Sequence, residues 1–172
     1  IVGVFYVPDA LVSPHMKNVL ACIMFIIAAI TDALDGYIAR NYNMATMMGA
    51  FLDSVADKLV VCSALVVLLA FDRVDMIVAL IIVGREIAVT ALREWMAKIG
   101  AAATVKVNWF GKIKTIAQMT AIPMLLFFDP FFGIDIYLVG TVLIWVAAVL
   151  TVYSMFVYMS AAWPHIEGGD AK

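Results

Sequence analysis

The 172-residue chain is 66% hydrophobic with a mean hydropathy of +1.06, whereas soluble domains are nearer half apolar. Only 14% of its residues are charged and the formal net charge is −2, which argues against nucleic acid or another polyanion as a partner. The composition indicates an integral membrane protein. The two cysteines, Cys22 and Cys62, lie in apolar runs without metal-ligand spacing, and we interpret both as buried thiols.

The first seven residues, IVGVFYV, are apolar, but Pro8 and Asp9 follow at once. A membrane-spanning helix needs roughly 20 residues. The sequence has no Met start and no signal-peptide pattern, so we expect these residues to be the end of a helix whose start is missing.

Five longer apolar stretches follow, each long enough to cross roughly 30 Å of hydrocarbon. Pro123 lies inside one of them and is expected to kink it. We expect an all-α integral membrane protein with a single domain over 1–172 and six transmembrane helices, the first of them truncated. The five full spans are predicted at 17–40, 46–71, 75–98, 109–128 and 136–162.

Basic residues orient these spans. They cluster in the segment 93–114, and Arg40 ends the span 17–40, whereas the opposite connections are rich in aspartate. By the positive-inside rule, the Arg40 end and the segment 93–114 face the cytoplasm.

Four aspartates lie on two consecutive predicted helices, in the segments TDALDGYIAR (31–40) and GAFLDSVADK (49–58). Each helix carries an i, i+4, i+8 pattern that places three residues on one face. The two sets are Asp32, Gly36 and Arg40, and Gly49, Asp53 and Asp57, while Asp35 starts a neighbouring stripe. If the two faces meet, four carboxylates converge beside glycines that let a ligand approach the backbone closely.

Carboxylates inside a bilayer need compensation. An aspartate at a helix centre costs roughly 2.5–3.5 kcal/mol, so four unpaired ones would cost on the order of 10 kcal/mol. Arg40 and Lys58 cannot neutralise all four, whereas a divalent cation could, and such a set can hold two ions for phosphoryl transfer. The alternatives are an interhelical salt-bridge cluster, placement at the membrane interface, and an ion relay in a transporter.

The same positions form a complete signature pattern, by which the chain resembles the CDP-alcohol phosphatidyltransferases. The pattern is Asp32-x2-Asp35-Gly36-x2-Ala39-Arg40-x8-Gly49-x3-Asp53-x3-Asp57. The segments GREIAVTALREWMAKIG (84–100) and WFGKIKTIAQM (109–119) resemble the branch of this family that uses glycerol 3-phosphate, and the similarity continues through 145–162.

The resemblance implies a multi-pass enzyme of the bacterial cytoplasmic (inner) membrane, active as a homodimer. It would transfer a phosphatidyl group from CDP-diacylglycerol to sn-glycerol 3-phosphate among membrane lipids. The alternatives are another acceptor, such as inositol phosphate or serine, and, outside the family, an ion-coupled transporter.

The resemblance also implies roles for the matching residues. Asp32, Asp35 and Asp53 would ligate divalent cations, two Mg²⁺ or Mn²⁺ per site, and Asp57 would share a metal or act as general base. The residues that would shape the cytidine and pyrophosphate site are Gly36, Ala39 and Gly49, with Arg40 binding pyrophosphate or supporting an ion pair.

A second candidate pocket follows from the residues themselves. Arg85 and Arg93 are spaced i, i+8 on one predicted helix, and Lys112 and Lys114 flank the start of the next. Guanidinium groups bind phosphate bidentately, so these four side chains are candidates for binding the phosphate of the acceptor.

The alternative for the outer basic residues, Lys98 and Lys106 above all, is that they only mark the cytoplasmic face. Arg85 differs because the segment IIVGREIAV surrounds it with apolar residues, which favours a functional role. Its neighbour Glu86 is either its ion-pair partner or a separate structural group.

Overall fold

A computed structural model describes residues 1–41, 47–99, 109–130 and 133–167. Within these ranges the side chains left undescribed are those of 36–41, 47, 50, 51, 53, 54, 109–112, 161 and 164–167. The described backbone forms helices and no β-strand. The helices are α1 (Val2–Phe5), α2 (Pro14–Asn41), α3 (Met47–Ala70), α4 (Met76–Lys98), α5 (Trp109–Phe127) and α6 (Ile136–Glu167).

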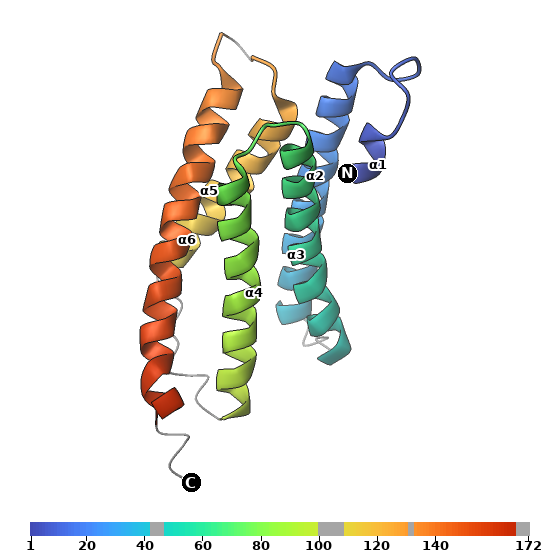
Figure 1. Cartoon of the computed structure of the whole chain (residues 1–172). Coiled ribbons are helices and arrows are strands. Elements are labelled where there is room, and N and C mark those ends of the chain that lie inside the picture. Colours follow the sequence, from blue (N-terminus) through green and yellow to red (C-terminus); the bar gives the residue numbers. More distant parts are fainter. Residues whose placement is uncertain (42–46, 100–108, 131–132, 168–172) are drawn as a thin grey trace.

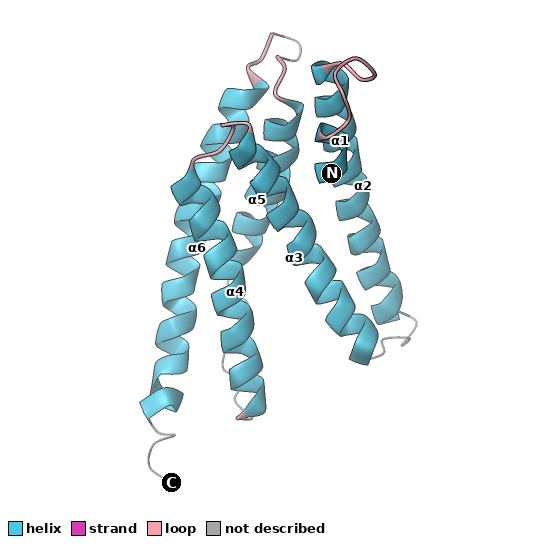
Figure 2. Cartoon of the chain, turned by 45° about the vertical axis from the view of Figure 1, so that its right-hand side comes forward, coloured by secondary structure: helices cyan, strands magenta, loops and turns pink. Residues whose placement is uncertain are grey.

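The long helices α2–α6 run lengthwise as a bundle, and consecutive helices alternate in direction (Figures 1 and 2). The short α1 packs against α2 and α3. The connections α1–α2, α3–α4 and α5–α6 lie at one end of the bundle, the upper end in Figure 1, which we call the connection end.

Short acidic side chains start two of the helices at the connection end. Asp75 accepts a hydrogen bond from the Ile77 amide at 2.7 Å before α4, and Asp135 accepts one from the Leu138 amide at 3.0 Å before α6. Each aspartate pairs an amide that the first helical turn leaves without an intrahelical partner, which fixes where the helix begins.

The helix α3 ends in a left-handed turn. Asp72 has a φ of 54°, its amide donates to the Leu69 carbonyl at 3.1 Å, and the Arg73 amide donates to the Leu68 carbonyl at 2.8 Å. These two bonds form a Schellman motif, with aspartate where glycine is usual. The turn directs the Arg73 side chain back toward the bundle.

Arg73 joins three parts of the connection end. Its guanidinium donates to the Leu126 carbonyl of α5 at 2.9 Å and to Asn18 Oδ1 of α2 at 2.8 Å, and it lies 4.4 Å from the centroid of the Phe128 ring. Burial lowers the pKa of this guanidinium, while the charge of Asp129 acts in the opposite direction. Because an arginine side chain stays charged in proteins, these contacts persist at all ordinary pH values.

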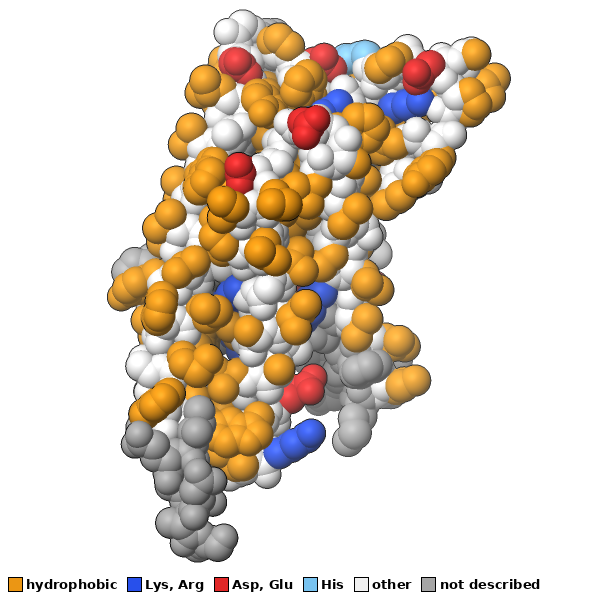
Figure 3. All heavy atoms as spheres, in the orientation of Figure 1, with side chains coloured by type: hydrophobic (Ala, Val, Ile, Leu, Met, Phe, Trp, Pro, Cys, Tyr) orange, Lys and Arg blue, Asp and Glu red, His pale blue; other side chains and the backbone are white. Residues whose placement is uncertain are grey.

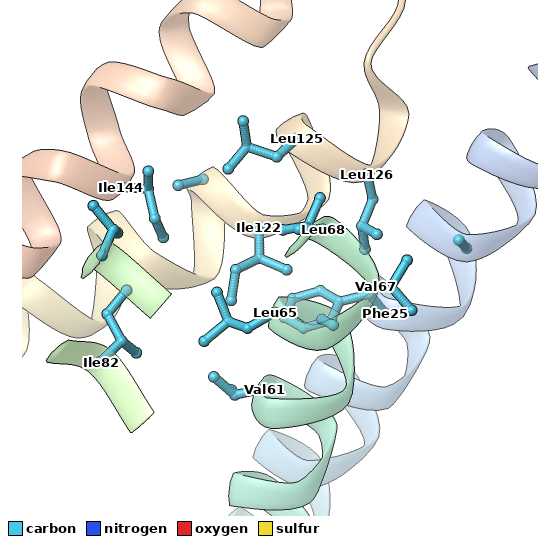
Figure 4. Packing of buried hydrophobic residues seen from close by; sticks show 14 of the residues in the cluster. Phe25, Val61, Leu65, Val67, Leu68, Ile82, Ile122, Leu125, Leu126 and Ile144 are labelled. Atoms are coloured by element: carbon cyan, nitrogen blue, oxygen red, sulfur yellow. The ribbon is translucent and has the colours of Figure 1, made fainter. Parts of the chain in front are cut away.

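The apolar core centres on α5 (Figure 4). Ile122 and Leu125 of α5 are fully buried together with Leu65 of α3, Phe25 of α2 and Ile144 of α6. This core fixes the rotation of α5, and with it the side chains that α5 turns toward the other helices.

Many large apolar side chains of the described residues are exposed, and they cover much of the face shown in Figure 3, while acidic side chains gather at the connection end. Among the described helices, Pro14–Asp35 of α2 and Ile136–Ser160 of α6 are long and apolar enough to cross a membrane, and Ile113–Phe127 is a shorter apolar segment. A surface this apolar is unusual for a water-soluble monomer and indicates a membrane protein.

The predicted helices agree closely with these bounds, and the largest difference is at the end of α6, which was predicted at 162 and extends to Glu167. Pro123 lies inside α5 as expected. Cys22 and Cys62 are free thiols, as expected. The expectation that both are buried was wrong, because each is only half-buried. Cys22 packs against the edge of the apolar core.

Candidate functional site

Two adjoining cavities contain the described carboxylates of the aspartate pattern and the described basic residues of the predicted acceptor pocket. The carboxylate cavity, of about 330 Å³, lies between α2, α3 and α5, and its acidic lining residues are Asp32, Asp35 and Asp57. The basic cavity, of about 600 Å³, lies between α3, α4, α5 and α6. Its charged lining residues are Asp57, Lys58, Arg85, Glu86, Arg93 and Lys114. Because Asp57 lines both cavities, ligand groups bound in the two would meet beside its carboxylate.

The carboxylate cavity takes its acidic groups from facing helices. Asp32 and Asp35 come from α2 and Asp57 from α3, and Asp32 and Asp57 are half-buried whereas Asp35 is exposed. Phe25 and Val60 line the same cavity, so the carboxylates border an apolar wall. The helical periodicity therefore brings three of the four predicted carboxylates to one cavity.

The other residues of the aspartate pattern have described backbone within α2 and α3. Gly49 is exposed near the start of α3. The side chains that lie outside the described part of the chain are those of Asp53, Ala39 and Arg40. For Gly36 the structure describes the backbone but not the exposed fraction. The proposed roles of all these residues stay predictions.

Arg85 is held inside the basic cavity by groups from two helices. The residue is 8% exposed, and its Nη1 atom donates to Glu86 Oε1 and its Nη2 atom to Ser154 Oγ of α6, both at 3.2 Å. The Ser154 hydroxyl in turn donates to the Thr151 carbonyl at 3.0 Å. A buried guanidinium needs such partners, and these fix the plane of its fork.

Lys114 of α5 forms the second buried ion pair, with the same Glu86 oxygen, and is only 2% exposed. Glu86 therefore joins a cation of α4 to a cation of α5. The question that the sequence left open about Glu86 is answered here, since it is the ion-pair partner of Arg85. Removing Glu86 would leave two buried cations without this compensation.

Arg93 lies two turns from Arg85 on α4, toward the more exposed part of the same cavity. Its Nη2 atom donates to the Tyr158 hydroxyl at 2.9 Å, and its guanidinium lies 5.2 Å from the centroid of the Tyr158 ring. The Arg85 guanidinium lies 5.8 Å from the same centroid. One tyrosine of α6 therefore positions both arginines through its ring and hydroxyl.

The charges in the basic cavity favour an anionic ligand. Four basic side chains face two carboxylates there, an excess of two formal positive charges. The side chain of Lys112, the remaining member of the predicted acceptor pocket, lies outside the described residues, as does all of Lys106. Lys98 is exposed at the end of α4 and does not line the cavity.

The comparisons with known proteins agree with one another. Residues 1–153 match the family model for CDP-alcohol phosphatidyltransferase. The chain is 43% identical over 164 residues to the CDP-diacylglycerol–glycerol-3-phosphate 3-phosphatidyltransferase of Salmonella choleraesuis (strain SC-B67), covering 94% of this chain and 86% of that protein. It is 45% identical to the protein of the same name from Yersinia enterocolitica serotype O:8, covering 87% and 82%. The chain belongs to the CDP-alcohol phosphatidyltransferase family.

CDP-alcohol phosphatidyltransferases depend on divalent cations, and the donor chemistry of the carboxylate cavity fits such ions. Carboxylate oxygens are the ligands that Mg²⁺ and Mn²⁺ prefer, and three carboxylates line this cavity. Among the described side chains no group of three acidic, histidine or cysteine residues is close enough to hold a metal ion. The carboxylate of Asp53, the remaining aspartate of the family pattern, lies outside these described side chains.

Sequence reasoning missed three polar residues of the basic cavity in this CDP-alcohol phosphatidyltransferase. Ser154 and Tyr158 position the arginines, and Gln118 lines the cavity one turn beyond Lys114 on α5. The i, i+4 spacing of Ser154 and Tyr158 within the apolar segment LTVYSMFVYM (150–159) was the available signal, because it places two polar groups on one helix face.

Proposed function

We propose that this protein transfers the phosphatidyl group of CDP-diacylglycerol to sn-glycerol 3-phosphate, giving phosphatidylglycerol phosphate and CMP in phospholipid biosynthesis. The observation that carries the proposal is the meeting of a carboxylate cavity and a basic cavity at Asp57. The relatives that are named for this reaction, at 43–45% identity, support the choice of both substrates.

The carboxylate cavity is the proposed donor site. Asp32, Asp35, Asp53 and Asp57 would hold two divalent cations, Mg²⁺ or Mn²⁺, which when bound neutralise the charge of the pyrophosphate and of the departing CMP. The residues proposed to shape the nucleotide site are Gly36, Ala39, Arg40 and Gly49. The apolar wall at Phe25 and Val60 suits the lipid part of a donor better than its charged part.

The basic cavity is the proposed acceptor site. Its excess of two positive charges matches the charge of a phosphate monoester. Arg85 and Arg93 would bind the phosphate oxygens, because Ser154 and Tyr158 already hold the two guanidinium groups in place. Lys114 would add a point charge, as would Lys112 from the same end of α5.

Transfer then follows from the position of Asp57. The primary hydroxyl of the acceptor attacks the lipid-linked phosphorus, and a new P–O bond forms as the P–O bond to CMP breaks. CMP leaves with the bonding electrons, and the hydroxyl proton passes to the Asp57 carboxylate. A carboxylate is a weak base, so this proton moves late, once the attacking oxygen has become acidic through bonding to phosphorus.

We also propose that residues 1–172 form one transmembrane domain in the bacterial inner membrane, with α2–α6 crossing it. The apolar outer surface and the acidic connection end support this placement, and the basic residues of 93–114 support a site on the cytoplasmic side. The sixth span expected from residues 1–7 and the homodimer stay predictions.

An acceptor panel tests the proposed reaction. Purified protein in detergent micelles is given labelled CDP-diacylglycerol with glycerol 3-phosphate, inositol phosphate, serine or no acceptor, and CMP release is measured. We expect release with glycerol 3-phosphate alone, and only with Mg²⁺ or Mn²⁺ present, so EDTA should stop it. Release with another acceptor would change the proposed substrate, and no release with any acceptor would exclude the transferase.

A further inference from the structure

Two residues that line the basic cavity each carry a buried polar atom without a hydrogen-bond partner among the described residues. One atom is Oε1 of Gln118, a residue that is 4% exposed, and the other is Nε of Arg85. Nearly all buried polar groups in native proteins are paired, so two complementary unpaired atoms beside one cavity indicate a ligand group that pairs them.

The chemistry of the two atoms restricts that group. Arg85 Nε is a hydrogen-bond donor, and Gln118 Oε1 is an acceptor. A carboxylate or phosphate oxygen only accepts, so it would satisfy Arg85 but not the amide oxygen, and an ammonium group only donates. A hydroxyl both accepts and donates, so a single hydroxyl has the chemistry to pair with both atoms.

The position of Gln118 indicates which hydroxyl this is. Gln118 follows Lys114 at i+4, on the same face of α5 and about 6 Å further along the helix axis. Gln118 therefore lies further along α5 than Lys114, and it lines the same basic cavity as Asp57, which also lines the carboxylate cavity. Glycerol 3-phosphate carries a secondary hydroxyl between its phosphate and the primary hydroxyl that reacts, so this is the hydroxyl left for Gln118 when the phosphate binds the cations and the primary hydroxyl lies at Asp57.

We infer that Gln118, with Nε of Arg85, binds the secondary hydroxyl of the acceptor and makes the enzyme select glycerol 3-phosphate over phosphates that lack this hydroxyl. The terminal torsion of a glutamine side chain is soft, so the amide can turn to present Oε1 to the cavity. The inference rests on the proposed function and assigns a specificity-determining residue within its acceptor site.

The first measurement uses the unaltered enzyme with two acceptors, sn-glycerol 3-phosphate and 3-hydroxypropyl phosphate, which differ only in the secondary hydroxyl. A buried hydrogen-bonding site rejects an analogue that leaves it unpaired, so kcat/KM should favour glycerol 3-phosphate by about tenfold or more. Equal kcat/KM values would overturn the inference whatever any variant does. If neither acceptor releases CMP, the proposed function itself fails and the inference fails with it.

The second measurement uses Gln118→Met, which keeps the length of the side chain and removes the amide. We expect kcat/KM for glycerol 3-phosphate to fall until the two acceptors differ by less than about threefold, with the value for 3-hydroxypropyl phosphate nearly unchanged. An equal loss for both acceptors would mean that Gln118 is structural. Thr120→Val is the matched control, because Thr120 lies on the exposed face of α5 and its hydroxyl bonds the Ile116 carbonyl at 2.8 Å.

Discussion

Arg85 combines burial with a fixed orientation, and the orientation is what a lysine could not reproduce. Its fork reaches Glu86 and Ser154 from separate nitrogens. We predict that Arg85→Lys, which keeps the charge, raises the acceptor KM by about tenfold because planar, bidentate recognition of phosphate is lost. The KM for CDP-diacylglycerol should change by less than about twofold, since Arg85 lines only the basic cavity.

Steady-state kinetics with each substrate varied in turn measure this effect. Lys98→Ala is the control, because Lys98 is exposed at the end of α4 and should leave both KM values unchanged. An unchanged acceptor KM in Arg85→Lys would mean that the guanidinium serves only to hold α4 against α6.

Asp57 is the residue that both cavities share, and its predicted role as base can be separated from metal binding. We predict that Asp57→Asn lowers kcat by at least about a hundredfold, because general-base catalysis typically contributes that much. The dissociation constant of CDP-diacylglycerol should rise far less, since the other carboxylates still bind the donor. Single-turnover CMP release and equilibrium donor binding measure the two quantities.

The same isosteric change just before the start of α6, at the connection end, supplies the control. Asp135→Asn should leave both quantities unchanged, because asparagine also caps the start of α6. If donor binding in Asp57→Asn weakens by as large a factor as turnover falls, Asp57 is a ligand and the base is another group.

The packing of α5 against α6 depends on Gly140. A Cβ added there would lie 3.1 Å from both Leu125 Cγ and Met124 Cβ, tighter than ordinary van der Waals contact. Small residues let helices approach closely where lipid gives no hydrophobic driving force for their association. We therefore predict that Gly140→Val destabilises the protein by about 1–3 kcal/mol through overpacking.

Thermal unfolding in detergent, followed by circular dichroism, measures this loss. Gly84→Val is the matched substitution, because a Cβ at Gly84 meets no atom within 4 Å. A similar loss of stability at both positions would attribute the effect to helix propensity and not to the contact between α5 and α6.

Helices were the easiest elements to predict because apolar runs of sufficient length end at clear signals. Asp75 and Asp135 start α4 and α6 as caps, and the predicted starts at 75 and 136 differ from the observed ones by one residue or none. The end of α6 was the least accurate, because the apolar pattern fades gradually and Pro164 is not where the helix stops.

The contacts across the basic cavity could not be predicted in the same way. Ser154 and Tyr158 lie 69 and 65 residues from the arginines that they contact. Their pairing depends on the rotation of α6 about its axis. The i, i+4 spacing of Ser154 and Tyr158 indicates that they share one helix face, but it does not indicate which helix that face meets. By contrast, Asp32 and Asp57 lie on consecutive helices whose spacing alone brought them to one cavity.

The two ends of the bundle differ in charge, as the proposed orientation in the membrane requires. Acidic side chains occupy the connection end (Figure 3), and Arg73, which lies at that end, is held by Asn18 and by the end of α5. The described basic residues Arg93, Lys98 and Lys114 belong to the other end, where α4 finishes and α5 begins. Cytoplasmic substrates would then reach the basic cavity, and the connection end would face the periplasm.

This orientation predicts opposite labelling of the two ends. In a background in which Cys22 and Cys62 are replaced by alanine, Leu11→Cys lies on the α1–α2 connection, where Leu11 is 78% exposed, and Lys98→Cys lies at the exposed end of α4. A membrane-impermeant maleimide applied to spheroplasts should label the cysteine at 11 and leave the one at 98 unmodified until the cells are lysed. The reverse pattern would place the substrate-binding end outside the cytoplasm, where neither CDP-diacylglycerol nor glycerol 3-phosphate is expected. Labelling of both positions in intact spheroplasts would contradict a bundle that spans the membrane with its two ends on opposite sides.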